Sequence, residues 1–344
     1  MLLSDFITQL INEPITLFSI ILLSGVVTVN GWTDAPTAIA ACISTKSLSP
    51  KKAIMLASVM NFAGVCVMSL LSGKVADTVS GIADFGNNPE TACITICASM
   101  LTIILWAVTA WFFGIPTSES HALIASISGA SIALSHSFSS VSSDELTKVI
   151  AGLFISTILG FVFGFISTKL TKSLIKNLDR LKTDNYFKYL QNISAAFMAF
   201  MHGAQDGQKF IGVFILLKTY TSFTNEINSF TLIIYVSVLM ALGTSFGGMR
   251  IIKSMGNDMV KLKKYQGFAS DLSGAASLLI STLTGLPVST THAKTTAMIG
   301  VAASEKITSV NWKIAKDMIL TWILTFPGCG FAGYLITKIF LSLR

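Results

Sequence analysis

The segment MHGAQDGQKF, residues 201 to 210, places several polar and ionisable side chains between the apolar runs AAFMAF and IGVFIL. Within it, Asp206 and Lys209 lie only three residues apart. Ionisable groups inside such apolar segments are costly and usually face a cavity where they handle ions or substrate. A carboxylate suits a cation, and a lysine ammonium suits an anion. The segment therefore indicates a site for charged ligands.

This segment has an earlier relative in the chain. NGWTDAPTAIA (30–40) aligns with HGAQDGQKFIG (202–212), so that Asp34 and Asp206 are 172 positions apart. Glycines flank the second acid and Pro36 follows the first, and both residue types weaken a helix. We predict one broken helix around 30–37 and another around 203–209. Half-helix ends attract anions, and freed carbonyls together with carboxylates bind cations.

A second motif also occurs twice. GIPTSESHALIASISGA (114–130) matches GLPVSTTHAKTTAMIGV (285–301), and the prolines Pro116 and Pro287 are 171 positions apart. Proline favours the first turn of a helix, where hydroxyls and free N–H groups bind a tetrahedral oxyanion. Together with two polar residues of the first motif, this predicts an anion site formed by Thr117, Ser118, Ser120, Ser289, Thr290, Thr291, Gln205 and Lys209.

The acids of these motifs indicate coupling to a cation. Asp34, Asp206 and Glu119 supply negative charge, whereas Lys209 supplies one positive charge. A divalent oxyanion that enters among carboxylates needs a co-bound cation or protons to cancel the repulsion. Sodium at Asp34 and Asp206 is one candidate. No other cofactor is expected.

Some polar residues have two interpretations. His121 and His292 either pack structurally or handle a proton or the substrate. Lys209 either pairs with Asp206 or contacts the anion. Asp271 is either a functional acid or a helix-end residue, and Lys294 stays outside the core site because it has no counterpart in the first copy.

The composition is that of a membrane protein. Only 12% of the 344 residues are charged, 52% are hydrophobic and the mean hydropathy is +0.70, whereas a soluble domain carries about 25% charged residues. The apolar runs are continuous, so helices rather than a barrel satisfy the backbone, and the predicted fold class is all-α and polytopic. Residues 1–14 show no features of a removable signal peptide. Long apolar segments lie near 14–29, 53–72, 91–113, 149–168, 189–201, 231–249, 268–283 and 314–341, with shorter ones at 34–44, 116–135, 206–217 and 287–303.

The duplicated motifs predict two repeats, each with a broken helix and a Pro-Ser/Thr segment. We assign residues 1–171 to the first repeat, with its motif at 116–121, and 189–344 to the second, with its motif at 287–292. Residues 172–188 form a predicted cytoplasmic linker. Basic residues cluster near 46–52, 169–188 and 250–264, so these loops are expected in the cytoplasm. That gives five crossings per repeat, inverted repeats and extracytoplasmic termini. If the Pro-Ser/Thr segments re-enter as hairpins instead, one loop violates the charge rule.

These motifs resemble those of the PiT family of inorganic phosphate transporters. HGAQDGQK and NGWTDAPT look like that family's duplicated G-A-N-D-V-A-N signature, and GLPVSTTHAKT is similar to its Pro-Ser/Thr-His motif. The resemblance covers essentially the whole chain and implies a cation-coupled symporter that binds phosphate between inverted repeats. It also implies cation ligands at Asp34, Asp206, Thr33 and Glu119. Thr33, Gln205 and Glu119 depart from the family pattern, so the choice between sodium and proton stays open.

We therefore expect a secondary active transporter that takes up inorganic phosphate across the cytoplasmic membrane by alternating access. The closest alternative is a sulfate symporter, because hydroxyls and helix N-termini recognise the tetrahedron without fixing its central atom. An anion channel is a different class, but paired broken helices with carboxylates favour tight binding over weak multi-site occupancy. An enzyme is not expected, because the Ser-Glu-Ser-His cluster of the first copy is Ser-Thr-Thr-His in the second, which lacks the acid that a hydrolase would need. The basic loops explain the net charge of +7 without a nucleic-acid partner, and a homodimer is left open.

Overall fold

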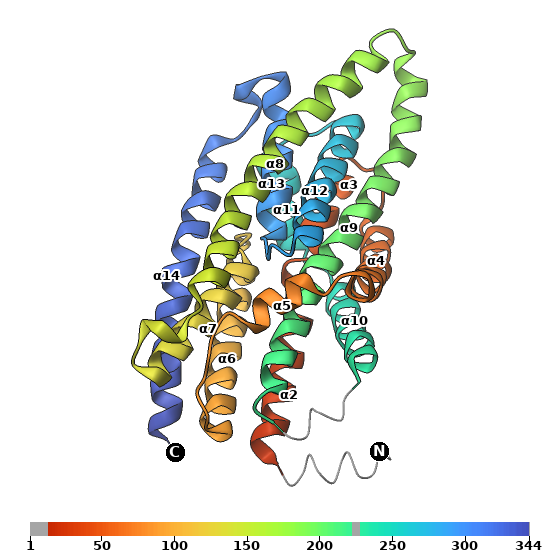
Figure 1. The fold of residues 1–344 in the computed structure, drawn as a ribbon. Coiled ribbons are helices and arrows are strands. Elements are labelled where there is room, and N and C mark those ends of the chain that lie inside the picture. Colours follow the sequence, from red (N-terminus) through yellow and green to blue (C-terminus); the bar gives the residue numbers. More distant parts are fainter. Residues whose placement is uncertain (1–12, 222–227, 344) are drawn as a thin grey trace.

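The computed structural model describes residues 13–221 and 228–343. These residues form helices, and their extended pairing is limited to two isolated bridges, Ala83 with Val141 and Val260 with Val310. The predicted all-α fold is confirmed (Figure 1). The expectation for the N-terminal segment falls largely on residues 1–12, which lie outside the described residues.

Proline begins four helices of the first half, where its fixed φ suits the first turn and its missing N–H costs no hydrogen bond. The elements of this half are α2 (Pro14–Thr33), α3 (Pro36–Ser44), α4 (Pro50–Leu71), α5 (Lys74–Ser80), α6 (Pro89–Phe113), α7 (Glu119–Ser135), η1 (Phe138–Ser140) and α8 (Ser143–Ile175). Those of the second half are α9 (Arg180–Lys218), α10 (Ser229–Ser245), α11 (Met249–Lys253), the π-helix η3 (Ser254–Met259), α12 (Lys264–Thr284), α13 (Thr290–Glu305), η4 (Ile307–Ser309) and α14 (Trp312–Ser342).

Several helices are long and apolar enough to span a membrane. Within the described residues there are five, namely α2 with α3, α4, α6, α8 and α14, and a sixth if α10 and α11, bent by 66°, count as one span. Large apolar side chains such as Phe154 and Ile158 on α8 face outward, as lipid contact requires. The chain is a multi-pass membrane protein. The expected five crossings per repeat are not supported, because α7 and α13 have only 17 and 16 residues, fewer than the roughly 20 that a span needs.

The first predicted helix break is present. Asp34 and Ala35 form a turn between α2 and α3. Pro36 has no N–H to donate and disfavours helix at the residue before it. The Thr37 N–H donates to the Asp34 carbonyl at 2.9 Å, which starts α3 with a tight turn. The break thus places an acid between two helix halves.

The second predicted break is wrong, because α9 continues without interruption through residues 203–209. Its glycines serve close packing instead. A Cβ at Gly203 would lie 2.4 Å from the Asn61 carbonyl oxygen, and one at Gly207 would lie 2.4 Å from the Val65 side chain. The glycines therefore let α9 lie against α4, and without a proline the helix stays intact. The predicted linker is also shorter than expected, since 172–175 belong to α8 and 180–188 to α9.

Helices α6 and α7 form a hairpin, and so do α12 and α13. Near the end of α7, Ser131 donates a hydrogen bond of 2.7 Å to the carbonyl of Asp84, which precedes α6. At the start of α12, the Tyr265 hydroxyl donates to Glu305, the last residue of α13, at 2.9 Å. The outer ends of each hairpin thus lie together. Each tip begins with a glycine at positive φ, which ends the first helix. The tips comprise residues 114–118 and 285–289.

The two hairpins point in opposite directions. Helix α8 begins just after the outer end of α7, and near its own end Lys172 donates to Glu305 at the outer end of α13. The hairpins therefore open toward opposite ends of α8, and their tips meet between those ends. The packing is also reciprocal, since α7 lies against α14 and α13 lies against α8. Inverted copies would produce this arrangement, and the inverted relation of the whole repeats stays a prediction.

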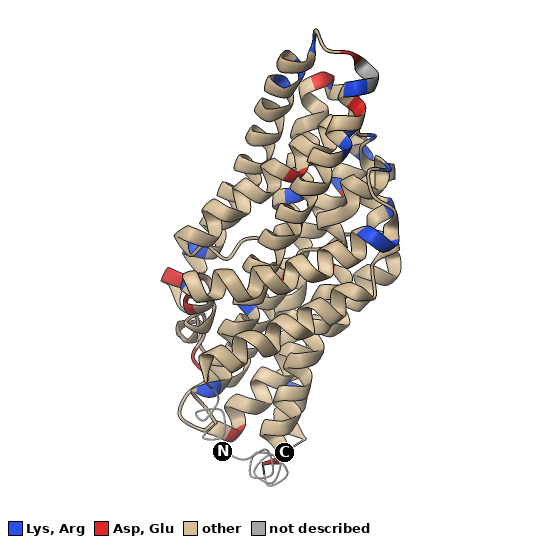
Figure 2. Cartoon of the chain, turned by 90° about the vertical axis from the view of Figure 1, so that its right-hand side faces the viewer, with Lys and Arg blue, Asp and Glu red and all other residues tan. Residues whose placement is uncertain are grey.

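Residues of all three basic loops lie together at one end of the molecule. A surface groove there is lined by residues from all three, including Thr45, Lys176 and Lys263. The Lys264 ammonium donates to Asp184 across two of these loops. Figure 2 shows the Lys and Arg residues, in blue, gathered mainly toward the end where α8 and α9 meet. This grouping is what the charge pattern predicts, and its position on the cytoplasmic side stays a prediction.

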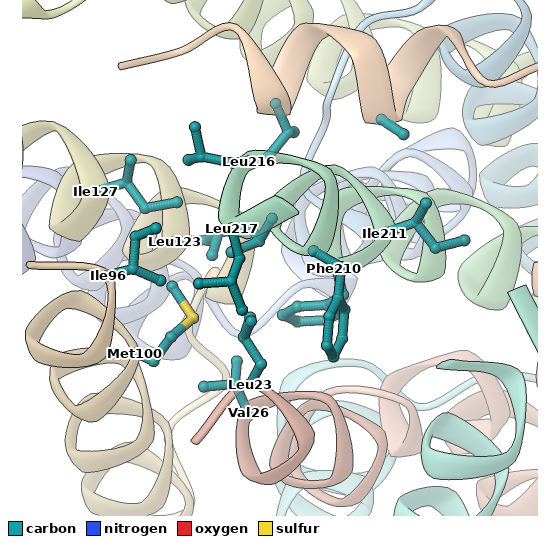
Figure 3. Close-up of a cluster of buried hydrophobic side chains, with 14 of the residues drawn as sticks. Leu23, Val26, Ile96, Met100, Leu123, Ile127, Phe210, Ile211, Leu216 and Leu217 are labelled. Atoms are coloured by element: carbon teal, nitrogen blue, oxygen red, sulfur yellow. The ribbon is translucent and has the colours of Figure 1, made fainter. Parts of the chain in front are cut away.

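An apolar core joins α2, α6, α7 and the last third of α9 (Figure 3). Leu23 and Val26 of α2 pack with Met100 of α6, Leu123 of α7 and Phe210 of α9. On α7 and α9 these residues lie close in sequence to the polar residues of the two motifs. The core therefore fixes the position of the polar side chains that these two helices carry up to one turn earlier in the sequence.

The close α4–α9 packing gives a first prediction. Gly203→Ala should lower the unfolding temperature of the purified protein in detergent, because overpacking against the Asn61 backbone costs about 1–3 kcal/mol. Gly330→Ala is the matched control, since it also lies inside a helix and its new Cβ would be 3.6 Å from the nearest atom. Equal unfolding temperatures for both variants would contradict the packing role.

Candidate functional site

Ten polar side chains form one buried cluster where the α2–α3 break, the middle of α9 and the two hairpin tips meet. Each is at most 5% exposed. We call this group the polar cluster, and its members are Asn30, Thr33, Asp34, Glu119, Ser120, His202, Asp206, Lys209, Thr290 and Thr291.

Asp34 lies at the N-terminus of α13. The Thr290 hydroxyl donates to its Oδ2 at 3.0 Å, and the Thr291 hydroxyl donates to its Oδ1. Thr290 also lies 3.3 Å from Asp206 Oδ2, so its hydroxyl connects the acids of the two repeats. The hydroxyls at the start of α13 thus compensate an acid of the first repeat.

Asp206 is paired with Lys209 one turn along α9. The Lys209 Nζ donates to Asp206 Oδ1 at 2.6 Å, to the Ser120 hydroxyl at 2.5 Å and to the Val288 carbonyl at 2.5 Å. An ammonium has three hydrogens, and these three oxygens use all of them. Of the two interpretations of Lys209, this structure therefore shows the pairing with Asp206. It does not show the predicted contact with an anion.

Glu119 begins α7 and faces the first repeat's broken helix. The Thr33 hydroxyl donates to its Oε1, and the Asn30 amide donates to its Oε2 at 3.0 Å. The same Asn30 amide lies 3.3 Å from Asp206 Oδ2. All four predicted cation ligands, Asp34, Asp206, Thr33 and Glu119, therefore lie in one cluster, and their role as ligands stays a prediction.

A directed chain of hydrogen bonds fixes the orientation of His202. The Thr244 hydroxyl donates to the Met240 carbonyl at 2.8 Å, so its oxygen accepts the Asn61 amide at 2.9 Å. The Asn61 carbonyl oxygen then accepts from His202 Nδ1 at 3.2 Å. This leaves His202 Nε2 facing Asp206 Oδ2 at 3.4 Å and Asp34 Oδ2 at 3.9 Å.

Those three groups have the arrangement of a cation site. One ligand atom each from Asp34, His202 and Asp206 lies within 4.8 Å of the others, and all three residues are buried. With Nδ1 protonated, Nε2 either holds a second proton or presents a lone pair beside two carboxylates. In the first case the imidazolium itself carries a positive charge beside the carboxylates. In the second case the lone pair and the carboxylates together would bind a cation.

The serines of the hairpin tips cap their helices. Ser118 accepts the His121 N–H and Ser289 accepts the His292 N–H, both at 3.2 Å. The first N–H groups of α7 and α13 have no partner within their helices, and the two helix starts are adjacent because Ser120 donates to the Val288 carbonyl at 3.3 Å. Two helix N-termini with hydroxyls therefore converge from the two repeats.

Four predicted anion ligands lie outside the polar cluster. Ser118 and Ser289 are the capping residues just described, and the other two are Gln205 and Thr117. Gln205 donates to the Leu286 carbonyl at 2.8 Å and accepts from the Thr282 hydroxyl at 2.6 Å, so both ends of its amide hold the second hairpin tip in place. The Thr117 side chain lines an apolar surface pocket with Trp106. The assignment of both side chains to the anion site is therefore corrected.

Asn30 and His202 were missed by the sequence reasoning. Each lies four residues before a motif acid and therefore on the same helix face, one turn earlier. They also occupy equivalent positions in the two copies, 172 residues apart. This i, i+4 spacing is the signal that would have identified them.

The two motif histidines support the packing interpretation. The rings of His121 and His292 are 4.7 Å apart, and His292 lies 3.7 Å from the Trp322 ring. Lys294 donates to Asp271, and neither side chain has any exposed surface. The pair joins α12 to α13 outside the polar cluster, which places Asp271 in the helix interior rather than at its end.

The fold and the cluster define a multi-pass transporter in which ionisable groups from the α2–α3 break, the start of α7 and the middle of α9 surround one buried site. The sequence profile of the phosphate transporter family matches residues 30–333. The chain belongs to this family, as the resemblance of its motifs predicted.

Curated relatives agree with this assignment. The chain is 37% identical over 303 residues to the "Probable low-affinity inorganic phosphate transporter" of Bacillus subtilis, covering 87% of this chain and 89% of that protein. It is 35% identical over 318 residues to the protein of the same name from Rhizobium meliloti, covering 89% and 93%. A solved structure described as "The sodium-dependent phosphate transporter" shares the fold with a TM-score of 0.84 at 18% identity, covering 96% of this chain and 99% of that one.

The two acids should differ in their effect on stability. Asp206→Asn leaves the buried Lys209 without its carboxylate, which costs about 3–5 kcal/mol. Asp34→Asn should cost less, about 1.5–3 kcal/mol, because Asp34 accepts hydrogen bonds from two neutral hydroxyls rather than from a buried ammonium. Thermal unfolding in detergent measures the stability of both variants. The double variant Asp206→Asn with Lys209→Met should be more stable than Asp206→Asn alone, because it leaves no unpaired ammonium. A larger loss for Asp34→Asn would contradict the pairing.

Proposed function

We propose that this protein takes up inorganic phosphate by symport with a cation across the cytoplasmic membrane, using alternating access. The observation that carries the proposal is the convergence of three acids with two hydroxyl-bearing helix N-termini in one buried cluster. Membership of the phosphate transporter family supports phosphate as the substrate. The names of the relatives describe transporters, which agrees with a protein that is not an enzyme.

In this proposal phosphate binds at the N-termini of α7 and α13. Its ligands are the hydroxyls of Ser120, Thr290 and Thr291 together with the first N–H groups of the two helices. Helix N-termini stabilise anions through these N–H groups and the helix dipole. Neutral donors also avoid the desolvation cost of several fixed positive charges.

Coupling follows from a competition for the hydroxyls. Thr290 and Thr291 donate to the Asp34 carboxylate in this structure. A cation bound at Asp34 neutralises that carboxylate and releases the two hydroxyls to donate to phosphate. Without the cation, the anion meets uncompensated carboxylates in a medium of low polarity, where like charges repel strongly. Each ligand therefore improves the site for the other.

The structural arrangement also supports alternating access. The two hairpins open toward opposite ends of α8, and their tips meet at the polar cluster. Rocking of one repeat against the other would expose this fixed site first to one side and then to the other. The basic loops support a cytoplasmic location for the α8–α9 end, which agrees with the extracytoplasmic termini that we predict.

The transport experiment uses purified protein in proteoliposomes and labelled phosphate. Inward sodium and proton gradients are imposed one at a time. We expect one of them to drive uptake, and we expect uptake to be lost when that gradient is collapsed. Excess sulfate should compete weakly, because phosphate keeps a proton near neutral pH that an acid of the cluster accepts as a hydrogen bond. If uptake is the same with either gradient as with none, symport is ruled out. If sulfate competes as well as phosphate itself, the site does not select phosphate over sulfate.

The hydroxyl ligands give a further prediction. Thr290→Val should raise the KM for phosphate roughly ten- to a hundredfold, since a hydrogen bond to a charged ligand is worth about 1.5–3 kcal/mol. Thr296→Val is the control on the same helix, because its hydroxyl donates to the His292 carbonyl. If the two variants have the same KM, the anion does not bind at the start of α13.

A further inference from the structure

The Lys209 ammonium has the surroundings of a bound cation. Its three partners are a carboxylate oxygen of Asp206, the hydroxyl oxygen of Ser120 and the carbonyl oxygen of Val288, all within 2.6 Å of Nζ. Carboxylate, hydroxyl and carbonyl oxygens are the ligands that proteins offer to hard cations. Lys209 itself is 1% exposed. We call this set of three oxygens the Asp206 cation position.

The internal repeat defines an equivalent position in the other half. Asp206 corresponds to Asp34 at an offset of 172, and Ser120 corresponds to Thr291 at an offset of 171. The carbonyl of Val288 corresponds to that of Thr117, again at 171. The structure supports this correspondence, because the Thr291 hydroxyl donates to Asp34 across the repeats. We call this second set the Asp34 cation position.

The two positions differ in the residue that lies three positions after the acid in the sequence. Lys209 holds this place in the second repeat, and Thr37 holds it in the first, at the same offset of 172. The Thr37 hydroxyl is buried and has no hydrogen-bond partner among the described residues. One position thus contains a tethered ammonium, and the other offers a further hydroxyl ligand.

We propose that the Lys209 ammonium takes the place of one transported cation, so that a single mobile cation, at the Asp34 position, occupies the pair. The positive charge that a cation would bring to Asp206 is permanently present in this chain. It compensates the acid and fills the space in every step of the cycle. This inference rests on the proposed symport and specifies how many cations these two positions contribute to it.

The test exchanges the residues between the repeats. Lys209→Thr gives the second repeat the residue of the first and should open the Asp206 position to sodium. In proteoliposomes, the voltage at which phosphate flux reverses under fixed sodium and phosphate gradients reports the number of cations per phosphate. We expect this number to rise by one in Lys209→Thr. Thr37→Lys should lower it by one, because it fills the Asp34 position.

A second readout does not depend on transport. The unfolding temperature of purified Lys209→Thr should rise with sodium chloride, relative to equal choline chloride, more than that of the wild type. The added response should disappear when Ser120→Ala removes a ligand of the same position. Lys294→Thr is the matched control, since Lys294 is also buried and paired but lies outside the polar cluster.

The outcomes separate the inference from the proposed function. An unchanged cation number in both exchanges, with no sodium response in Lys209→Thr beyond that of Lys294→Thr, would overturn the role of Lys209. If wild-type uptake needs no gradient, symport fails, whereas the sodium response of Lys209→Thr still reports on the Asp206 position. If Lys209→Thr does not fold, Thr37→Lys decides: an unchanged cation number overturns the inference.

Discussion

The structure depends on the burial of three carboxylates and one ammonium where the two hairpin tips meet. Asp34, Asp206 and Glu119 are nearly inaccessible to solvent, and unpaired charges in such surroundings would be prohibitively costly. Their compensation comes from Lys209 and from hydroxyls and amides on other elements. Because those partners come from both repeats, the cluster holds the repeats together and is sensitive to any ligand that changes its charge.

The rest of the fold positions these partners. Pro36 breaks the first helix and leaves Asp34 in a turn, whereas glycines let α9 approach α4 closely enough to bring His202 to Asn61. Positive-φ glycines end α6 and α12 so that the next helices start inside the protein. Each feature is a local backbone property, and together they place two helix N-termini against two acids.

The sequence predicted the chemistry of the site better than its backbone. The repeated motifs identified Asp34, Asp206 and Thr290 correctly as neighbours, because equivalent positions of two copies meet at one interface. The break at 203–209 was wrong because a glycine has two uses, to weaken a helix or to admit a neighbour, and only the packing of α4 decides between them. Gln205 was misplaced for a related reason, since its direction depends on where the second hairpin tip lies.

In the mechanism that we propose, one buried cluster binds phosphate and a cation cooperatively through Asp34. Equilibrium binding of labelled phosphate to the purified protein, measured against sodium concentration and pH, tests it most directly, with Asp34→Asn as the comparison. We expect wild-type phosphate affinity to increase with one of the two cations and the variant to lose that dependence. Linkage requires the effect to be reciprocal. A phosphate affinity that is independent of both cations, or a dependence that persists in Asp34→Asn, would contradict the account.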